Sequence, residues 1–368
     1  MRLLLDLGAE RIALGLISGT SMDGIDAAVV RLSGDPPTIE TLSSVCQPYS
    51  ESTRLALFDL IDNGSLALYA KLDRELGELF SDAGTEAIRS AGLQAVDVVG
   101  SHGQTVWHEP NGPFANTVQI GSPAVIARRL QAPVVADFRT ADIAAGGQGA
   151  PLVPYLDWLV LKDRAPAIAL NIGGIANLTI VQPGGPEKMI AFDAGPGNCL
   201  IDLLVARATG EKYDRDGGLA ALGQVDEGAL AAYLNLAYFG KPPPKSTGRE
   251  LFNKEFLGES AVADPLAHIA TITELTARSI AQAIERWAPN DVKELYISGG
   301  GLHNKELVRR IENHGFRLHP YSELGIDSDA KEAILFAVLA DARLRDAPVS
   351  FPGTTGVSEP TRLGAIYW

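Results

Sequence analysis

Two stretches decide the fold: residues 12–30 read IALGLISGTSMDGIDAAVV, and residues 167–181 read AIALNIGGIANLTIV. In each, a short apolar run enters a turn of small and polar residues, and a second apolar run leaves it. This is the sequence form of a β-hairpin. Small residues leave the backbone amides of such turns open to a ligand, and grouped amides bind anions. The pair therefore predicts two phosphate-binding turns holding a polyphosphate, with two ordinary tight turns as the alternative.

The segments after each hairpin alternate between helical and strand patterns. Residues 52–92 carry leucines at helical spacing with a break at Asn63-Gly64, which predicts two helices. Short apolar runs at 98–106 and 134–136 predict strands, and residues 265–287 predict a long core-facing helix. Because the order repeats in both halves, we expect an α/β protein with a helix-covered mixed sheet in each half. One large doubly wound sheet is the alternative.

Length and composition limit the function classes. A chain of 368 residues exceeds the size of a single growing core, so two domains are expected. The net charge of −14, without any Lys/Arg-rich block, argues against a nucleic-acid partner. Cys46 and Cys199 fit no metal spacing or disulfide framework. No apolar run approaches the ~20 residues of a membrane span and no signal peptide is recognisable, so a cytoplasmic protein without membrane contact is expected.

Domain boundaries are expected at two places. Residues 1–135 are predicted to form an N-terminal lobe, with 350–368 packing back on it, and residues 136–349 a C-terminal lobe. The glycine-rich residues 137–151 are predicted to be a loop at the lobe boundary. Residues 1–11 precede the first motif and are expected to be a disordered extension or a misassigned start.

Asp193 is the candidate catalytic residue. It follows the apolar run 189–192 and precedes Ala-Gly-Pro-Gly, so its carboxylate is expected at the mouth of a cleft. A carboxylate in that place can act as general base while a phosphoryl group is transferred. Capping of the next helix is the alternative, although Asn198 suits that role better.

Further polar and glycine-rich strings suggest ligand contacts. The triplet Gly299, Gly300 and Gly301 between a strand and a helix lets a flat ligand such as adenosine lie on bare backbone, with a plain loop as the alternative. The run 100–110 concentrates His, Gln, Thr and Glu at a strand end, which suits a hydroxylated or amide-bearing substrate. In the first turn, Asp23 or Asp26 could hold Mg²⁺, and a turn-capping role for Asp23 is equally compatible.

With these residues in view, the sequence resembles the 1,6-anhydro-N-acetylmuramic acid kinase family of the sugar kinase, Hsp70 and actin superfamily. The resemblance runs from about residue 12 to the C-terminus. It is carried by many strings in one order: Gly15–Asp26, Gly100–Thr105, His108–Pro110, Thr117–Gly121, Ala136–Arg139, Gly146–Pro151, Asn171–Gly174, Phe192–Asn198, Asp214–Gly217, Pro244–Glu250 and Ser298–Gly301.

The resemblance implies a two-lobed actin-like ATPase (ribonuclease H-like) fold and an ATP-dependent reaction in the recycling of bacterial cell-wall fragments. Water opens the 1,6-anhydro ring of the sugar at C1 while O6 takes the γ-phosphoryl group, which gives N-acetylmuramic acid 6-phosphate and ADP. The family also implies Mg²⁺, lobes that close on the substrate, and commonly a homodimer. Two other readings compete with it. One is a phosphatase or plain hexose kinase on the same fold, and the other is a non-enzymatic ATP-binding module.

Residue roles follow from the same resemblance. Asp193 matches the catalytic base, Asn171, Gly173 and Gly174 a second phosphate loop, and Gly299–Gly301 the adenosine side. His102, Gln104, Gln119 and Arg139 are the candidates for the sugar. The first phosphate-binding stretch comprises Ser18, Gly19, Thr20, Ser21, Met22, Asp23, Gly24, Ile25 and Asp26. The strand segment Ala13–Ile17 lacks the metal-binding Asp common in the superfamily, so Asp23 is the candidate metal ligand.

Overall fold

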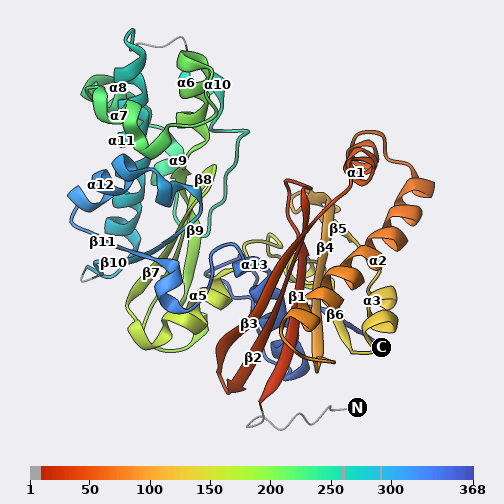
Figure 1. Cartoon of the computed structure of the whole chain (residues 1–368). Helices are drawn as coiled ribbons and strands as arrows, with labels where there is room; N and C mark the ends of the chain where they lie inside the picture. Colours follow the sequence, from red (N-terminus) through yellow and green to blue (C-terminus); the bar gives the residue numbers. More distant parts are fainter. Residues whose placement is uncertain (1–9, 259–261, 291) are drawn as a thin grey trace. The chain divides into compact units, whose positions relative to one another are not determined.

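The computed structural model describes residues 10–258, 262–290 and 292–368, which form two compact units (Figure 1). Unit 1 comprises the described residues up to Val160 together with Gly325–Trp368, and unit 2 comprises Leu161–Leu324. These boundaries differ from the expected ones, since 136–160 and 325–349 belong to unit 1. The reason is packing: the helix α13 (Lys331–Leu344) contacts the strands of the first sheet.

Unit 1 is built on a sheet whose described part has seven strands. Strands β1 (Arg11–Ser18), β2 (Gly24–Gly34) and β3 (Pro37–Pro48) form an antiparallel meander. Next to β1 lie the parallel strands β4 (Val98–Glu109) and β6 (Val134–Ala136). The strand β5 (Asn116–Ile120) pairs with the end of β4, and β12 (Ala365–Tyr367) joins the sheet at β6.

Helices cover both faces of this sheet. The helices α1 (Glu51–Asn63) and α2 (Leu66–Ser90) are separated at Gly64, whose φ of 61° ends α1 in the left-handed region. Apolar side chains of β1 pack with α2 in one core, and α3 (Pro123–Leu130) lies beside α2. On the opposite face α13 comes so near that a Cβ at Gly15 would lie 1.7 Å from the Ala333 carbonyl oxygen. Glycine in β1 therefore permits the contact.

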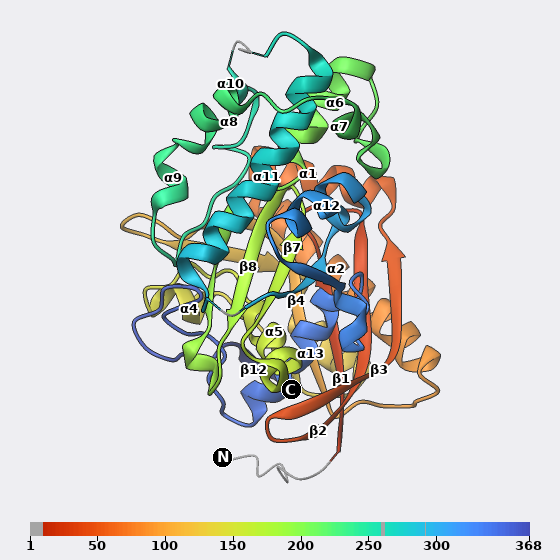
Figure 2. The same ribbon diagram turned by 90° about the vertical axis from the view of Figure 1, so that its left-hand side faces the viewer.

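Unit 2 repeats the same strand order. Its meander is β7 (Ala167–Ile172), β8 (Ile175–Val181) and β9 (Ile190–Pro196), followed by the parallel strands β10 (Glu294–Ser298) and β11 (Arg317–Pro320). The long helix α11 (Pro265–Trp287) runs along this sheet (Figure 2). It contributes Ala277, Ile280 and Ile284 to the core beneath it. Further helices are α6 (Cys199–Thr209), α7 (Gly218–Leu222), α8 (Glu227–Leu234), α9 (Ala237–Gly240), α10 (Lys254–Leu257) and α12 (Lys305–Asn313).

The duplicated order of three antiparallel and two parallel strands confirms the expected two-sheet, actin-like α/β class. It excludes the single doubly wound sheet among the described residues. The expected helices at 52–92 and 265–287 are confirmed, whereas the expected loop 137–151 contains the short helix α4 (Thr140–Ala144). Arg11 belongs to β1 and is buried against Asp341, so only residues 1–9 of the N-terminal segment lie outside the described residues. None of the described helices is long and apolar enough to cross a membrane.

Candidate active-site residues of the two units

In the first hairpin, the turn between β1 and β2 has a closed base and an open tip. The Ser18 hydroxyl lies 2.8 Å from the Gly24 carbonyl oxygen and 2.6 Å from Gln104 Oε1, and both Ser18 and Gln104 are buried. Their polar groups therefore fasten β1 to β2 and β4. Ile25 is fully buried in the core, so only its backbone can meet a ligand. The exposed members of the predicted stretch are Thr20, Ser21 and Asp23, with Gly19 and Met22 partly exposed.

Two carboxylates follow the tip. Asp23 Oδ1 accepts a hydrogen bond of 2.7 Å from Ser21 Oγ. Burial raises the pKa of Asp26, and the negative charges of Asp23 and Asp329 raise it further. A divalent cation would relieve this repulsion. The described residues hold no group of three or more His, Cys, Asp or Glu side chains able to form a complete metal cage. Mg²⁺, however, commonly takes one or two carboxylates and completes its shell with water and phosphate oxygens, so these residues fit it.

His102 and Arg139 come together in unit 1. Arg139 Nε donates to His102 Nε2 over 2.8 Å, and His102 Nδ1 lies 3.0 Å from the Gly103 carbonyl oxygen. The imidazole is therefore neutral, with its proton on Nδ1. Burial, with the nearby Arg139 charge second, holds the pKa of His102 well below its usual range. Arg139 Nη1 also donates to the Gly149 carbonyl oxygen over 2.6 Å, and burial lowers the pKa of Arg139 to about 10.

Three of the four predicted sugar residues are linked through His102, and the fourth, Gln104, is engaged elsewhere. Gln104 is bound to Ser18, and Gln119 Nε2 donates to Thr117 Oγ1 over 2.7 Å. His102 and Gln119 line a cavity of about 390 Å³ in unit 1. Hydroxyl and carboxyl groups dominate its wall, including those of Tyr69, Asp73, Ser101, Thr117, Asp137 and Thr140. Such donors and acceptors suit a polyhydroxylated ligand.

The second hairpin has a tighter turn. Gly173 and Gly174 link β7 to β8, and their carbonyl oxygens accept the amides of Asn198 and Gly197 over 2.8 and 2.9 Å. A Cβ at Gly197 would lie 2.4 Å from the Gly173 carbonyl oxygen, whereas a Cβ at Gly173 or Gly174 would meet nothing closer than 3.7 Å. The outer side of the turn is thus open to a ligand. Asn171 Oδ1 accepts a hydrogen bond from Ser298 Oγ and lies against Gly299, which has a φ of 83°.

Asp193 lies within β9 rather than after its end, and is half-buried. Its Oδ2 accepts the Thr247 amide over 2.8 Å, and its own amide donates to the Lys245 carbonyl oxygen over 3.0 Å. Tyr238 Oη donates to the Asp193 carbonyl oxygen. Burial raises the pKa of Asp193 to about 6, although the Thr247 bond opposes the shift. A carboxylate with this pKa is ionised at neutral pH and remains basic enough to accept a proton.

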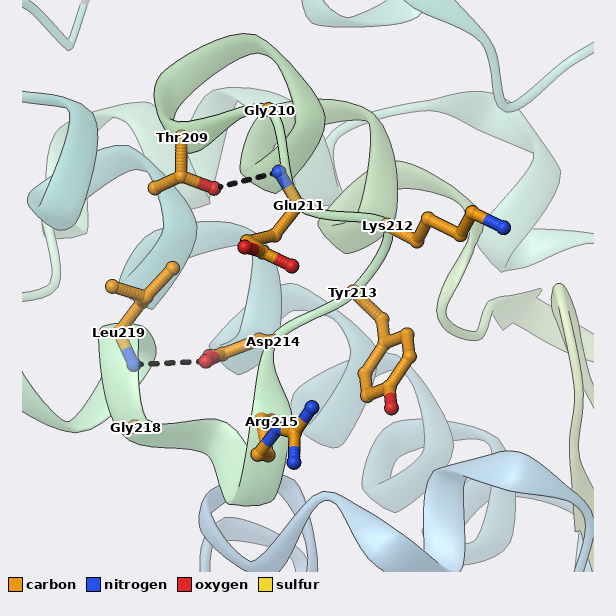
Figure 3. Close-up of a pocket in the computed structure, with 9 residues that line it drawn as sticks. All are labelled: Thr209, Gly210, Glu211, Lys212, Tyr213, Asp214, Arg215, Gly218 and Leu219. Carbon is orange, nitrogen blue, oxygen red and sulfur yellow. Dashed lines mark hydrogen bonds between the residues drawn. The ribbon is translucent and has the colours of Figure 1, made fainter.

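Of the predicted adenosine-side glycines, Gly300 lines a cavity of about 440 Å³ in unit 2. Asn198, Asp202, Tyr213, Arg215 and His303 are also in its wall. Gly301 is buried, and a Cβ there would lie 2.4 Å from Ile172 Cγ2. A neighbouring cavity of about 610 Å³ shares Tyr213, Asp214 and Arg215 (Figure 3). Figure 3 shows Asp214 accepting the Leu219 amide, a bond of 2.8 Å that fixes the loop before α7.

Comparison with known proteins identifies the family of the chain. A sequence model described as anhydro-N-acetylmuramic acid kinase matches residues 11–368. The chain belongs to the anhydro-N-acetylmuramic acid kinase family. Members similar to it include those of Caldanaerobacter subterraneus subsp. tengcongensis (41% identity, 97% of each chain covered) and Gloeobacter violaceus (42% identity, 97% of this chain and 98% of that one). A solved structure, component A of (R)-2-hydroxyglutaryl-CoA dehydratase from Acidaminococcus fermentans, matches at 11% identity and a TM-score of 0.44 over 91% of this chain and 99% of that one.

Sequence reasoning for this family member missed several residues around the site. Lys245 and Thr247 lie on Asp193, and Arg249 lies beside Gly174, with Nε 3.7 Å from the Cβ position of that glycine. All three belong to the string Pro244–Glu250, which carried the family resemblance without a role. Asp202, whose pKa is raised to about 6 by burial, also had no signal, because helical spacing alone does not show which polar residue faces a cavity.

Proposed function

We propose that this member of the anhydro-N-acetylmuramic acid kinase family carries out the ATP-dependent hydrolytic opening and phosphorylation of 1,6-anhydro-N-acetylmuramic acid in peptidoglycan recycling. Two lines support it: the family match over residues 11–368, and a half-buried carboxylate on β9 whose pKa of about 6 suits a general base. The second is the single structural observation that carries the mechanism.

In this mechanism Asp193 takes a proton from water. The water oxygen attacks C1 of the anhydro-sugar, and the C1–O6 bond breaks. O6 takes the γ-phosphoryl group of ATP, and ADP leaves, so that the products are N-acetylmuramic acid 6-phosphate and ADP. Because the chain must only ionise Asp193 and hold the reactants in line, positioning and electrostatics carry most of the catalysis.

The chain offers phosphate contacts in each unit. In unit 1 they are the exposed tip Gly19–Asp23, and in unit 2 they are the open outer side of Gly173 and Gly174. Arg249 beside Gly174 supplies a cation for the phosphates, a role that an acidic protein must fill locally. Mg²⁺ held by Asp23, with Asp26 nearby, would neutralise phosphate charge during the transfer. The cavity at Gly300 takes the adenosine.

The sugar contacts lie in unit 1. Arg139 is a cation whose Nε and Nη1 are engaged by His102 and Gly149, which fixes its guanidinium plane. A guanidinium held in one plane binds a carboxylate well, so we assign it to the lactyl carboxylate of the substrate. His102 and Gln119 complete the sugar site, and Gln104 supports it through Ser18. We also propose a cytoplasmic location and a homodimer. Sedimentation analysis of the purified chain would test the homodimer.

The decisive experiment uses ATP, Mg²⁺, the anhydro-sugar and ¹⁸O-labelled water. The proposal expects one ADP per sugar opened, with the label at C1. A plain hexose kinase would phosphorylate a free hydroxyl and leave C1 unlabelled, and an ATP-binding module would form no phosphosugar. Asp193→Asn keeps an oxygen for the Thr247 amide but cannot act as base, so turnover falls by about 10²- to 10⁴-fold while ATP still binds. Retained turnover in this variant would remove Asp193 from the role of base.

A further inference from the structure

The segment Lys245–Thr247 contacts the candidate base with its main chain on both sides. The Lys245 carbonyl oxygen accepts the Asp193 amide, and the Thr247 amide donates to Asp193 Oδ2 over 2.8 Å. The segment therefore lies beside β9 without being a strand of the sheet. Its hydrogen bond to Oδ2 fixes the side-chain torsion of Asp193. Oδ1 has no hydrogen-bond partner among the described residues.

The side chain of Lys245 anchors the segment. Its Nζ donates to the Tyr238 carbonyl oxygen over 3.1 Å and lies 4.5 Å from the centre of the Tyr238 ring, a cation–π contact. Tyr238 in turn donates through Oη to the Asp193 carbonyl oxygen over 2.9 Å. The three residues form a closed set of contacts around the base. A disturbance of Lys245 therefore reaches Asp193 by two routes, through the main chain and through Tyr238.

We propose that Lys245 and Thr247 are positioning residues that hold Asp193 so that Oδ1 alone accepts the proton of the attacking water. The proposal rests on the proposed function, since it assumes that Asp193 is the base. It gives Lys245 and Thr247 a role within the Pro244–Glu250 string, of which the proposed phosphate contacts use only Arg249. An Asp free to rotate would present either oxygen, and only part of its conformers would be in line with water and C1.

The charges around the pair support this assignment. Lys245 lowers and Glu250 raises the pKa of Asp193, and the Tyr238 phenol is the other titratable group in contact. Burial is the largest cause that lowers the pKa of Lys245, to about 8, and Arg286 of α11 and Lys241 lower it further while Asp193 raises it. At neutral pH the ammonium is charged beside an ionised base. Removing that charge raises the pKa of Asp193, so the ionised base is lost at a higher pH.

The test measures kcat and KM from pH 5 to 9 on the full chain. Lys245→Met removes the charge and the Nζ contacts with Tyr238 but keeps the main-chain bond to Asp193, and Lys245→Arg keeps a charge that does not titrate between pH 5 and 9. Thr247→Pro removes the amide donor, and Thr247→Val removes only the hydroxyl. We expect kcat of Lys245→Met and Thr247→Pro to fall by about tenfold or more, with the KM for ATP nearly constant. In both variants the acid limb of the plot of kcat against pH, which lies near pH 6 in the wild-type chain, should move to higher pH. In the wild-type chain, loss of the Lys245 charge as the pH rises through about 8 should also lower kcat. Lys245→Arg should keep the acid limb near pH 6 and lack this alkaline limb. Thr247→Val keeps the acid limb in place.

The outcomes separate the two proposals. If the wild-type chain has the acid limb and Lys245→Met keeps both its position and kcat, the positioning role is overturned while the base assignment stands. If the wild-type chain has no acid limb and Asp193→Asn retains turnover, the base assignment itself fails. Because Thr247→Pro can fail to fold, its thermal unfolding is compared with that of Ser246→Pro, and the Lys245 pair decides the question if both prolines are destabilising.

Discussion

Unit 1 and unit 2 share one strand order but differ at the end of the first hairpin. In unit 1 the turn between β1 and β2 spans residues 19–23 and carries Asp23, whereas in unit 2 Gly173 and Gly174 alone join β7 to β8. The candidate base is in unit 2, and the His102–Arg139 pair is in unit 1. The repeated sheet therefore supplies two equivalent places for polar turns, and loops of different sequence give each place its own chemistry.

The sheets also differ where their helices pack. In unit 1 Gly15 and Gly100 are register partners on neighbouring strands, and both face α13. In unit 2 Leu170 and Ile297 are register partners at the corresponding pair of strands and are buried in the core. The first sheet therefore admits helix backbone at close range, and the second fills the same space with side chains. Four predictions test how far these differences extend.

The largest expected effect is on stability, from opposite changes in the two sheets. In Gly100→Ala the new Cβ would lie 1.9 Å from the Phe336 carbonyl oxygen, so α13 must move, and we expect a loss of about 3 kcal/mol or more. Leu170→Ala leaves a cavity in unit 2 and should cost about 2–5 kcal/mol. Urea unfolding read by hydrogen exchange at β1 and β7 should show each loss in its own unit. Gly218→Ala, where nothing lies within 4 Å, is the control. A loss below about 1 kcal/mol in Gly100→Ala would contradict the close approach of α13.

A second comparison concerns the buried carboxylate that fixes a loop in each unit. Asp142 accepts the Gly149 amide and Thr355 Oγ1, and Asp214 accepts the amides of Leu219 and Ala220. In an Asn at either position, the side-chain NH₂ faces groups that themselves donate hydrogen bonds. Each change should therefore lower the free energy of unfolding by about 1–3 kcal/mol.

The kinetic outcomes of these two changes should differ. Asp142→Asn loosens Gly149, a partner of Arg139, and should raise the KM for the sugar. Asp214→Asn loosens the loop that carries Tyr213 and Arg215 and should raise the KM for ATP instead. Steady-state kinetics with each substrate varied in turn measures both. If both variants affected the same KM, the division of substrates between the units would be wrong.

A third prediction concerns pH. The pKa of His102 lies below that of an unfolded His near 6.5, so the unfolded state binds more protons. The free energy of unfolding therefore falls as the pH falls below about 6.5. The pKa of Asp193 is raised to about 6, so here the folded state binds more protons. The stabilisation that this gives is present at low pH and is lost as the pH rises through 6. Between pH 7.5 and 5, His102→Gln should therefore gain in Tm relative to the wild-type chain and Asp193→Asn should lose. The slopes should not exceed about 1.4 kcal/mol per pH unit. Parallel Tm curves for all three proteins would contradict both shifts.

The smallest expected effect compares the two turns directly. A Cβ at Gly19 or Gly174 meets no atom closer than 3.7 Å, so alanine should leave the Tm unchanged. If a phosphate approaches the backbone there, Gly19→Ala and Gly174→Ala should each raise the KM for ATP by about tenfold. The exposed Gly228→Ala in α8 is the matched control and should keep the KM of the wild-type chain. A rise in only one variant would show that the two turns are not equivalent in phosphate binding.

The repeated architecture and the main polar strings could be predicted from the amino-acid sequence alone. Periodicity placed the helices of residues 52–92 and 265–287, since apolar spacing directly records which face is buried. The small and polar residues of the two turns predicted both hairpins, because few residue types tolerate the backbone of a tight turn. Asp193 was found because it stands in an apolar run beside glycines, an unusual place for a charge.

Which side chains are in contact could be seen only in the folded chain. The unit boundaries depend on α13, which follows unit 2 in the sequence but packs on the sheet of unit 1. Gln104 proved to be bound to Ser18 rather than open, and Lys245 and Thr247 proved to lie on Asp193 from about fifty residues away. Contacts between residues so distant in sequence depend on packing and on loop paths. Local spacing does not encode them, because the spacing of a pattern specifies a face and not the partner that covers it.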